Sequence, residues 1–365
     1  MQVIRIVSRR VALAVLGVSL AASASAAEPL HSEMMPLAVS RGLILDLAEA
    51  ASRAVAVGDR GQILVSESRT EWRQVADVPT RATLTAVAAV GDAVWAVGHD
   101  GTILASRDGG LSWVLQREDV LDTGPDAAFD PRQGVPLLDI LMLDADRGFA
   151  VGAYSQLLRT TDGGASWQFV STASDAPEAD PVDQGGAVGD EDNWTLSDAD
   201  LAMGDVSDPH FNAIARTGSG ALLIVGERGS AFRSRDGGDT WERTELPYGG
   251  SMFGLIGYEG EHALAFGMRG NVFETHDLGE SWSAIETGTD LSLMGGAARG
   301  EGGFVLVGAN GIVVLRDGAG EAVTNQVYAN AAHETPVLAA VLARANRSLV
   351  VSGDKGVDQF APRRQ

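Results

Sequence analysis

Four aspartates recur in one short pattern of the kind that could supply acid–base chemistry. The pattern is Ser/Thr-x-Asp-x-Gly-x-Ser/Thr-Trp, here called the Asp-box. An aspartate in such a turn is expected to accept hydrogen bonds from backbone amides, while glycine supplies positive φ and the Trp is buried between neighbouring repeats. We therefore interpret the aspartates as structural and not catalytic. The four Asp and Trp pairs are Asp108 and Trp113, Asp162 and Trp167, Asp236 and Trp241, and Asp277 and Trp282.

A second set of candidate residues occupies a Gly-x-X-Gly pattern that recurs along the chain. Four of its seven X residues are basic, although the chain has 49 acidic and 27 Lys or Arg residues. Basic residues on an acidic protein would concentrate attraction for one anionic patch; alternatively, they simply tolerate exposed turns. The X residues are Arg60, Asp100, Tyr154, Arg228, Arg269, Asn310 and Lys355.

The three arginines among the X residues also suggest a glycoside hydrolase of the sialidase type, because sialidases hold a substrate carboxylate with three arginines. Arg60, Arg228 and Arg269 would form that triad. However, the Phe/Tyr-Arg-Ile/Leu-Pro motif of sialidases is absent, and none of the four tyrosines can be assigned as a nucleophile. A retaining glycoside hydrolase uses a pair of carboxylates about 5 Å apart, and such a pair remains possible among the 49 acidic residues. We expect no enzymatic activity.

The sequence predicts no metal or cofactor. The six histidines show no ligand spacing, and the acidic stretches lack the spacing of a calcium loop. The Gly-x-x-Gly pairs lie in hairpin turns and not at helix starts, so no phosphate site is expected. Binding of a glycan or small molecule without chemistry is a further alternative, although Tyr154 is the only aromatic among the X residues.

The elements that carry these residues repeat with a period near 40. A glycine that closes the second strand of each unit recurs seven times, with spacings of 40, 54, 74, 41, 41 and 45. This period predicts an all-β, seven-bladed β-propeller with four-stranded antiparallel blades. The last blade lacks a fourth strand, and we expect the segment Leu30–Val39 to close the ring as a strand. The closing glycines are Gly58, Gly98, Gly152, Gly226, Gly267, Gly308 and Gly353.

The two long spacings mark insertions at residues 118–135 and 171–208, each joining an outer strand to the next inner one. Their loops, the Gly-x-X-Gly turns and the connection at residues 247–253 should share the face opposite the Asp-boxes. On that connection, Tyr248 and Phe253 either form a contact surface or simply pack. The insertions are solvated loops or functional ones.

The N-terminus predicts export. Residues 1–26 have a basic start, an apolar run and small residues at Ala24-Ser25-Ala26, which is the pattern of a cleaved signal peptide, of the general or the twin-arginine type. Residues 27–365 would then form one periplasmic domain without cysteine. The net charge of −22 disfavours nucleic acid as a partner. No later stretch predicts membrane insertion, and we expect a monomer.

The repeats Val225-Gly-Glu-Arg-Gly229 and Phe266-Gly-Met-Arg-Gly270, with the adjoining Asp-box, resemble the photosystem II stability/assembly-factor-like family. The likeness is closest to its proteobacterial branch, which is associated with resistance-nodulation-division (RND) exporters. It implies a non-catalytic factor that binds a membrane protein or its periplasmic domain. It also implies an arginine-rich patch at Arg60, Arg228 and Arg269, but the acidic insertions disfavour a photosystem partner.

Overall fold

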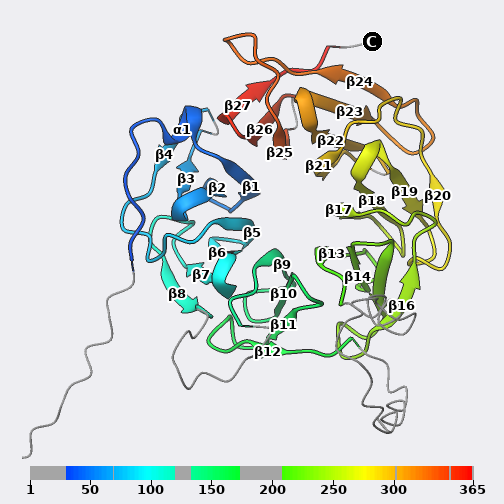
Figure 1. Cartoon of the computed structure of the whole chain (residues 1–365), viewed down its shortest axis with the longest axis horizontal. Helices are drawn as coiled ribbons and strands as arrows, with labels where there is room; N and C mark the ends of the chain where they lie inside the picture. The colour runs from blue at the N-terminus through cyan, green and yellow to red at the C-terminus, as the bar shows by residue number, and fades with distance from the viewer. Residues whose placement is uncertain are drawn as a thin grey trace, which may run out of the picture.

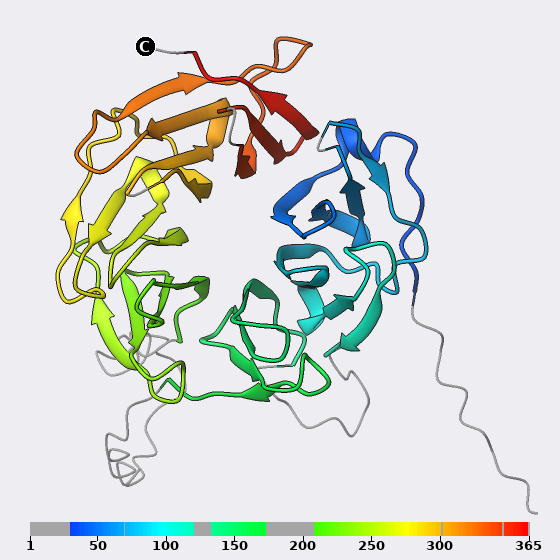
Figure 2. The same ribbon diagram turned by 180° about the vertical axis from the view of Figure 1, so that it is seen from behind.

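The chain folds into a ring of seven antiparallel sheets, or blades, around a central axis (Figures 1 and 2). The computed structural model describes residues 30–68, 70–119, 133–172, 208–300, 302–344 and 347–363. The predicted seven-bladed β-propeller is confirmed. The predicted signal peptide and most of both insertions lie outside the described residues, so the predictions about them stay predictions.

Blades 1 to 6 have four strands each, and each blade is a meander from the centre outward. Blades 1 to 3 comprise β1 (Ile44–Glu49), β2 (Ala54–Gly58), β3 (Ile63–Ser66), β4 (Arg73–Gln74), β5 (Leu84–Val90), β6 (Ala93–Gly98), β7 (Ile103–Ser106), β8 (Val114–Arg117), β9 (Leu137–Met142), β10 (Gly148–Gly152), β11 (Leu157–Thr160) and β12 (Gln168–Phe169).

Blades 4 to 6 repeat this order, and blade 7 ends after three strands. Their strands are β13 (Phe211–Arg216), β14 (Leu222–Gly226), β15 (Ser230–Ser234), β16 (Glu242–Glu245), β17 (Met252–Gly257), β18 (Ala263–Gly267), β19 (Val272–Thr275), β20 (Ser283–Ala284), β21 (Leu293–Ala298), β22 (Phe304–Gly308), β23 (Ile312–Arg316), β24 (Thr324–Val327), β25 (Leu338–Ala343), β26 (Leu349–Gly353) and β27 (Gly356–Phe360).

The core lies between the blades. The second strand of each blade is buried along its length, apart from the half-buried Ala93 at the start of β6, because both of its faces pack against neighbouring blades. The Ala54–Gly58 run of alanine, valine and glycine is an example. The Asp-box tryptophans fill the same junctions: Trp113 of blade 2 is 8% exposed and packs against Val55 and Val65 of blade 1. This packing is the burial that the sequence pattern predicts.

The ring is not closed by an N-terminal strand, so that part of the prediction is wrong. Residues 30–37 lie along the outside of blade 1, where Ser32 donates its amide to Val78 O (2.9 Å) and Met35 donates to the Gln74 side chain (2.8 Å). Pro36 has no amide hydrogen, so at this position the segment cannot donate the backbone hydrogen bond that strand pairing would need. Blade 7 stays three-stranded among the described residues.

Closure instead comes from side-by-side packing of the first and last blades. The inner strands β1 and β25 pack together, and the short helix α1 (Ala38–Arg41) lies against β27. Gly356 at the start of β27 donates its amide to Gly42 O at 2.9 Å. Gly356 has φ +78, and a Cβ there would lie 1.9 Å from Val39 O, so glycine alone permits this close approach.

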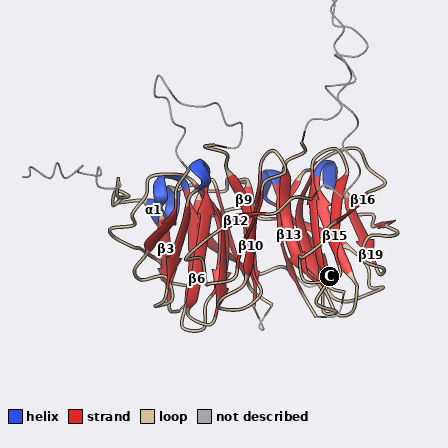
Figure 3. Ribbon diagram, turned by 90° about the horizontal axis from the view of Figure 1, so that it is seen from below, coloured by secondary structure: helices blue, strands red, loops and turns tan. Residues whose placement is uncertain are grey.

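The two ends of the strands carry different turns. Helix α1 and the short 3₁₀ turns between second and third strands lie at one end of the ring (Figure 3), here called the helical-turn face. These turns are η1 (Asp59–Gly61), η2 (His99–Gly101), η4 (Met268–Gly270) and η5 (Ala309–Gly311). No helix within the described ranges is long and apolar enough to cross a bilayer.

Candidate functional site

The Asp-box turns are saturated with internal hydrogen bonds. Asp108 Oδ1 accepts from the amides of Leu111 and Ser112, both at 3.0 Å, and from Ser106 Oγ at 2.7 Å, while Oδ2 accepts from Ser112 Oγ at 2.6 Å. Gly110, with φ +88, donates its amide to Ser106 Oγ. The same side-chain network recurs around Asp162, Asp236 and Asp277.

These hydrogen bonds keep the four carboxylates ionised. At Asp162 the hydroxyl and amide of Ser166 contribute most, and they lower its pKa to about 2. At Asp108 partial burial opposes the shift, but the bonds from Ser112 and Ser106 outweigh it and the pKa is again about 2. A carboxylate with so low a pKa is a poor proton donor near neutral pH. In these turns the carboxylates hold backbone amides and hydroxyls in place.

Arg60, Arg228 and Arg269 all occupy exposed turns on the helical-turn face and share a left-handed backbone conformation. Their φ angles are 53°, 54° and 56°, and the next residue in each turn is a glycine with φ between 68° and 72°. Left-handed φ is costly for a side chain with a Cβ, and Asn or Asp tolerates it better than Arg. The sequence pattern located these arginines but did not reveal their strained conformation.

The basic residues form two pairs around the ring and not one continuous cluster. Lys355 and Arg60 are on the adjacent blades 7 and 1, and Arg228 and Arg269 are on the adjacent blades 4 and 5. Acidic or neutral X residues occupy the three intervening blades, namely Asp100, Tyr154 and Asn310. Tyr154 is 54% exposed and meets the His210 ring edge-on, with 5.0 Å between ring centroids.

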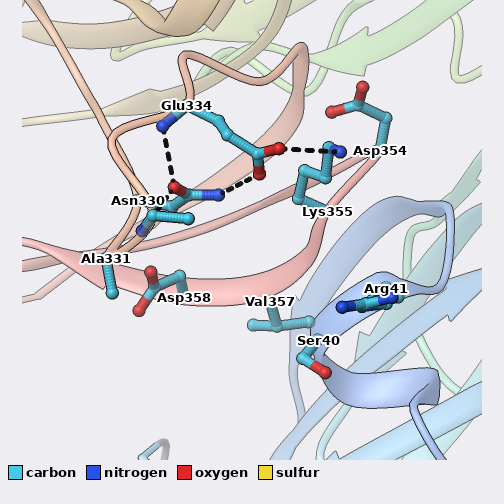
Figure 4. Close-up of a pocket in the computed structure, with 10 residues that line it drawn as sticks. Ser40, Arg41, Asn330, Ala331, Glu334, Asp354, Lys355, Val357 and Asp358 are labelled. Carbon is cyan, nitrogen blue, oxygen red and sulfur yellow. Dashed lines mark hydrogen bonds and ion pairs between the residues drawn. The ribbon is translucent and has the colours of Figure 1, made fainter.

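An open groove of about 800 Å³ lies between blade 7 and α1 on this face (Figure 4). Its charge is mixed: Lys355 Nζ lies 3.4 Å from Glu334 Oε1, and Arg41, Asp354 and Asp358 also line it. Hydrogen bonding from Asn330, followed by the charge of Lys355, lowers the pKa of Glu334, so this glutamate is ionised. Glu334 therefore offsets the positive charge of Lys355, and Asp59 lies 3.8 Å from the guanidinium of Arg60.

The two aromatics of the 247–253 connection have separate environments. Tyr248 is half-buried at the junction of blades 4 and 5, where its ring stacks on Phe273 with 6.1 Å between centroids. Phe253 instead lines the central cavity. These positions correspond to the packing alternative for Tyr248, and they do not bring it together with Phe253 as one surface.

Two carboxyls that the sequence analysis missed lie in this central cavity, which has a volume of about 300 Å³. Asp46 accepts from its own neighbour Leu47 and from Val87 of the next blade, both at 2.8 Å. Asp139 does the same with Ile140 and the next blade's Ile214. Burial raises the pKa of each to about 7, against the effect of these bonds.

The signal for these carboxyls is present in the repeat. Asp46 and Asp139 are the third residues of their inner strands, beside the irregularity in register that each inner strand has. The other blades have alanine or glycine there, namely Ala86, Ala213, Gly254, Gly295 and Ala340. Because the oxygens of both carboxyls accept bonds from two blades, their visible role is to tie adjacent inner strands together.

The fold also brings together three possible metal ligands that the sequence spacing of the histidines does not predict. His262, Glu274 and His276 offer ligand atoms that all lie within 4.8 Å of one another, although fourteen positions separate the two histidines in sequence. The hairpin of β18 and β19 brings them together, which no local spacing rule detects. Most of both acidic insertions lies outside the described residues, so the prediction that they are solvated loops and not calcium sites stays a prediction.

Comparison with known proteins identifies the architecture. No family model and no curated protein sequence matches the chain. A structure of YCF48 bound to a D1 peptide aligns at 17% identity and a TM-score of 0.59, over 89% of this chain and 94% of that one. This chain has a YCF48-like propeller fold. YCF48 from Cyanidioschyzon merolae aligns at 15% identity and a TM-score of 0.60, over 91% of this chain and 97% of that one.

Enzymes share the same architecture. The GH74 enzyme of Niastella koreensis aligns at 11% identity and a TM-score of 0.60, over 90% of this chain and 53% of that one. At these identities the comparisons show the fold alone. The choice between a binding protein and an enzyme therefore depends on the residues of this chain.

Proposed function

We propose that this chain is a non-catalytic, periplasmic protein-binding propeller that serves as an assembly, stability or accessory factor for an inner-membrane protein complex. The observation that carries the proposal is the placement of Arg60, Arg228 and Arg269 in exposed turns with left-handed backbone. An RND-type exporter is the partner that the family resemblance suggests. YCF48, whose fold is similar, binds a D1 peptide, which supports a peptide or protein as the ligand.

The backbone of the arginine turns gives the proposal its physical basis. A non-glycine residue with left-handed φ costs about 1 kcal/mol or more, and such strain is concentrated at functional sites. Blade 6 has Asn310 at φ 54°, which shows that the same turn accepts a less strained residue. Arginine therefore occupies three turns of a kind in which asparagine would be less strained.

Charge explains how these arginines would select a partner. The chain has a net charge of −22, so most of its surface repels acidic proteins. Against this field, exposed guanidinium groups on one face favour a partner that presents carboxylates in one orientation only. The association should therefore weaken as salt concentration rises.

The geometry also favours binding over sialidase-type catalysis. Arg60, Arg228 and Arg269 lie in turns on three different blades and none of them lines the central cavity. The Asp-box carboxylates are fully hydrogen-bonded and ionised, so they do not supply a general acid. Turnover of a fluorogenic sialoside or other glycoside by the purified protein would contradict the proposal.

The decisive experiment is capture of partners from detergent-solubilised membranes of the source cells. The protein with Arg60→Glu, Arg228→Glu and Arg269→Glu should capture at least about tenfold less of each specific integral-membrane partner. Quantitative mass spectrometry measures the captured amounts. Retention of every wild-type partner by this charge-reversed protein would refute the proposal that the three arginines on the helical-turn face form the docking site.

A matched control reverses three arginines outside the helical-turn face. Arg73 and Arg243 lie on outer strands and Arg147 lies in the turn between β9 and β10, and all three are more than half exposed. Their reversal changes the net charge by the same amount, so it should leave capture intact. Cell fractionation and N-terminal sequencing test the periplasmic part separately, with Ala27 as the expected first residue.

A further inference from the structure

Three side chains with metal-ligating atoms converge at the Asp-box end of blade 5. His262 immediately precedes β18, Glu274 is on β19, and His276 immediately follows β19. The register pairs Leu264 with Glu274 and Ala263 with Thr275, so continuing it by one position places His262 opposite His276. Because strand side chains alternate, Glu274 and His276 share one face of the hairpin. The hairpin thus builds a cross-strand cluster.

We propose that His262, Glu274 and His276 form a binding site for a divalent transition-metal ion of the Zn²⁺, Ni²⁺ or Cu²⁺ type. Imidazole nitrogens suit these ions, and two histidines with one carboxylate are an established ligand set in proteins. Mg²⁺ and Ca²⁺ prefer shells of oxygen ligands and should not compete. The site lies at the end of the ring opposite the helical-turn face, and this proposal does not depend on the proposed function.

The two half-buried members of the cluster hold their ligand atoms close together. The side chains of His262 and Glu274 are 14% and 15% exposed, and His262 Nε2 lies 2.9 Å from Glu274 Oε1. A metal binds the neutral imidazole and the ionised carboxylate of such a pair.

The present contacts show what an incoming ion must displace. His262 Nε2 lies 2.9 Å from Glu274 Oε1, and a metal with ligand distances of about 2.0–2.2 Å would take the place of the hydrogen between them. His262 would then carry its proton on the other ring nitrogen. His276 is exposed, and its ring lies 4.2 Å from the His262 ring at an angle of 31°. Its ring is therefore free to turn toward the shared ion.

Arg316 is the main opposing charge and also the group that orients the carboxylate. Its Nη2 donates to Glu274 Oε1 at 2.5 Å, and Nη1 lies 3.4 Å from Oε2. The guanidinium is held in turn by Gly302 O. Outer groups of this kind fix the direction of a ligand, although the positive charge lowers the affinity for a cation. The exposed His276 leaves one side of the ion open to water.

Titration of the tag-free protein with metal salts tests the proposal. We expect saturable binding of one equivalent of Zn²⁺ by calorimetry and a rise in melting temperature with Zn²⁺, but no response to Mg²⁺ or Ca²⁺. His276→Ala should weaken the Zn²⁺ affinity by at least about tenfold. His99→Ala, which removes an exposed histidine at the other end of the ring, should leave it unchanged.

A second variant keeps the result interpretable if a histidine change disturbs packing. Glu274→Gln preserves side-chain shape and both histidines but removes the ligand charge, so it should also weaken Zn²⁺ binding. Melting curves recorded without metal show whether each variant folds. Absence of saturable binding in the wild type, or equal Zn²⁺ affinity in wild type, His276→Ala and Glu274→Gln, would overturn the proposal.

Discussion

Replacing Arg60, Arg228 and Arg269 together by asparagine should stabilise the fold while abolishing capture of the membrane partner. All three arginines have φ between 53° and 56°, and Asn310 occupies the corresponding position of blade 6 at φ 54°. Asparagine adopts left-handed φ more readily than arginine because its short side chain hydrogen-bonds locally. The change removes positive charge from the face and relieves strain in the same turns.

The expected gain follows from the number of strained turns. Each substitution should recover about 0.5–1 kcal/mol, and sites on separate blades should add. The Arg60 side chain is 72% exposed and its nearest carboxylate oxygen, on Asp59, is 3.8 Å away, so losing this pair should cost at most about 1 kcal/mol. The net gain in unfolding free energy for the triple variant is then roughly 0.5–3 kcal/mol.

Urea unfolding followed by tryptophan fluorescence measures this gain. With a denaturant dependence of about 3 kcal/mol per molar urea, the midpoint should rise by roughly 0.2–1 M. The reverse change, Asn310→Arg, should lower stability by a comparable amount per site. A midpoint that falls in the triple variant would mean that the arginines stabilise their own turns. The strain argument for a functional face would then be wrong.

Three further predictions concern the fold. Asp108→Ala should lower the unfolding free energy by about 1–2 kcal/mol, which is the cost of losing a helix cap, because two turn amides lose their acceptor. Urea unfolding measures this loss. Asp46 and Asp139 bind protons more tightly in the folded state, where their pKa is about 7, so the unfolding free energy should decrease as the pH rises from about 4 to about 8. The double variant Asp46→Asn and Asp139→Asn should flatten this dependence of stability on pH, as measured by urea unfolding at a series of fixed pH values. Trp241→Ala should cost about 3–5 kcal/mol, measured by urea unfolding, since the side chain is 6% exposed between blades 3 and 4.

The repeat made the architecture predictable, because each blade contributes its own local signals. The glycine that ends each second strand and the Asp-box that follows the third are both encoded within a few residues. The left-handed arginines show the limit of that local information. Arg269 and Asn310 occupy equivalent turns, yet nothing in the pattern distinguishes a strained residue from a tolerant one before φ is known.

Features that join distant parts of the chain could not be predicted in this way. The His262 and His276 cluster depends on the register of one hairpin, and the inter-blade bond from Asp46 to Val87 depends on how two sheets stack. The closure of the ring was wrong for a related reason: the extended segment before α1 has apolar residues typical of a strand, but its partners are in blade 1.

Closure of the ring by packing alone has a consequence for how the protein reaches its native state. The inner strands that meet at the seam, β1 and β25, begin at Ile44 and Leu338, which are 294 positions apart in the sequence. Joining the ends of so long a flexible loop costs roughly 5 kcal/mol in entropy, whereas stacking each blade on the previous one requires only short-range contacts. We expect an arc of six or seven stacked blades to form first and the seam to close last. The seam should then also be the joint where hydrogen exchange detects the earliest opening.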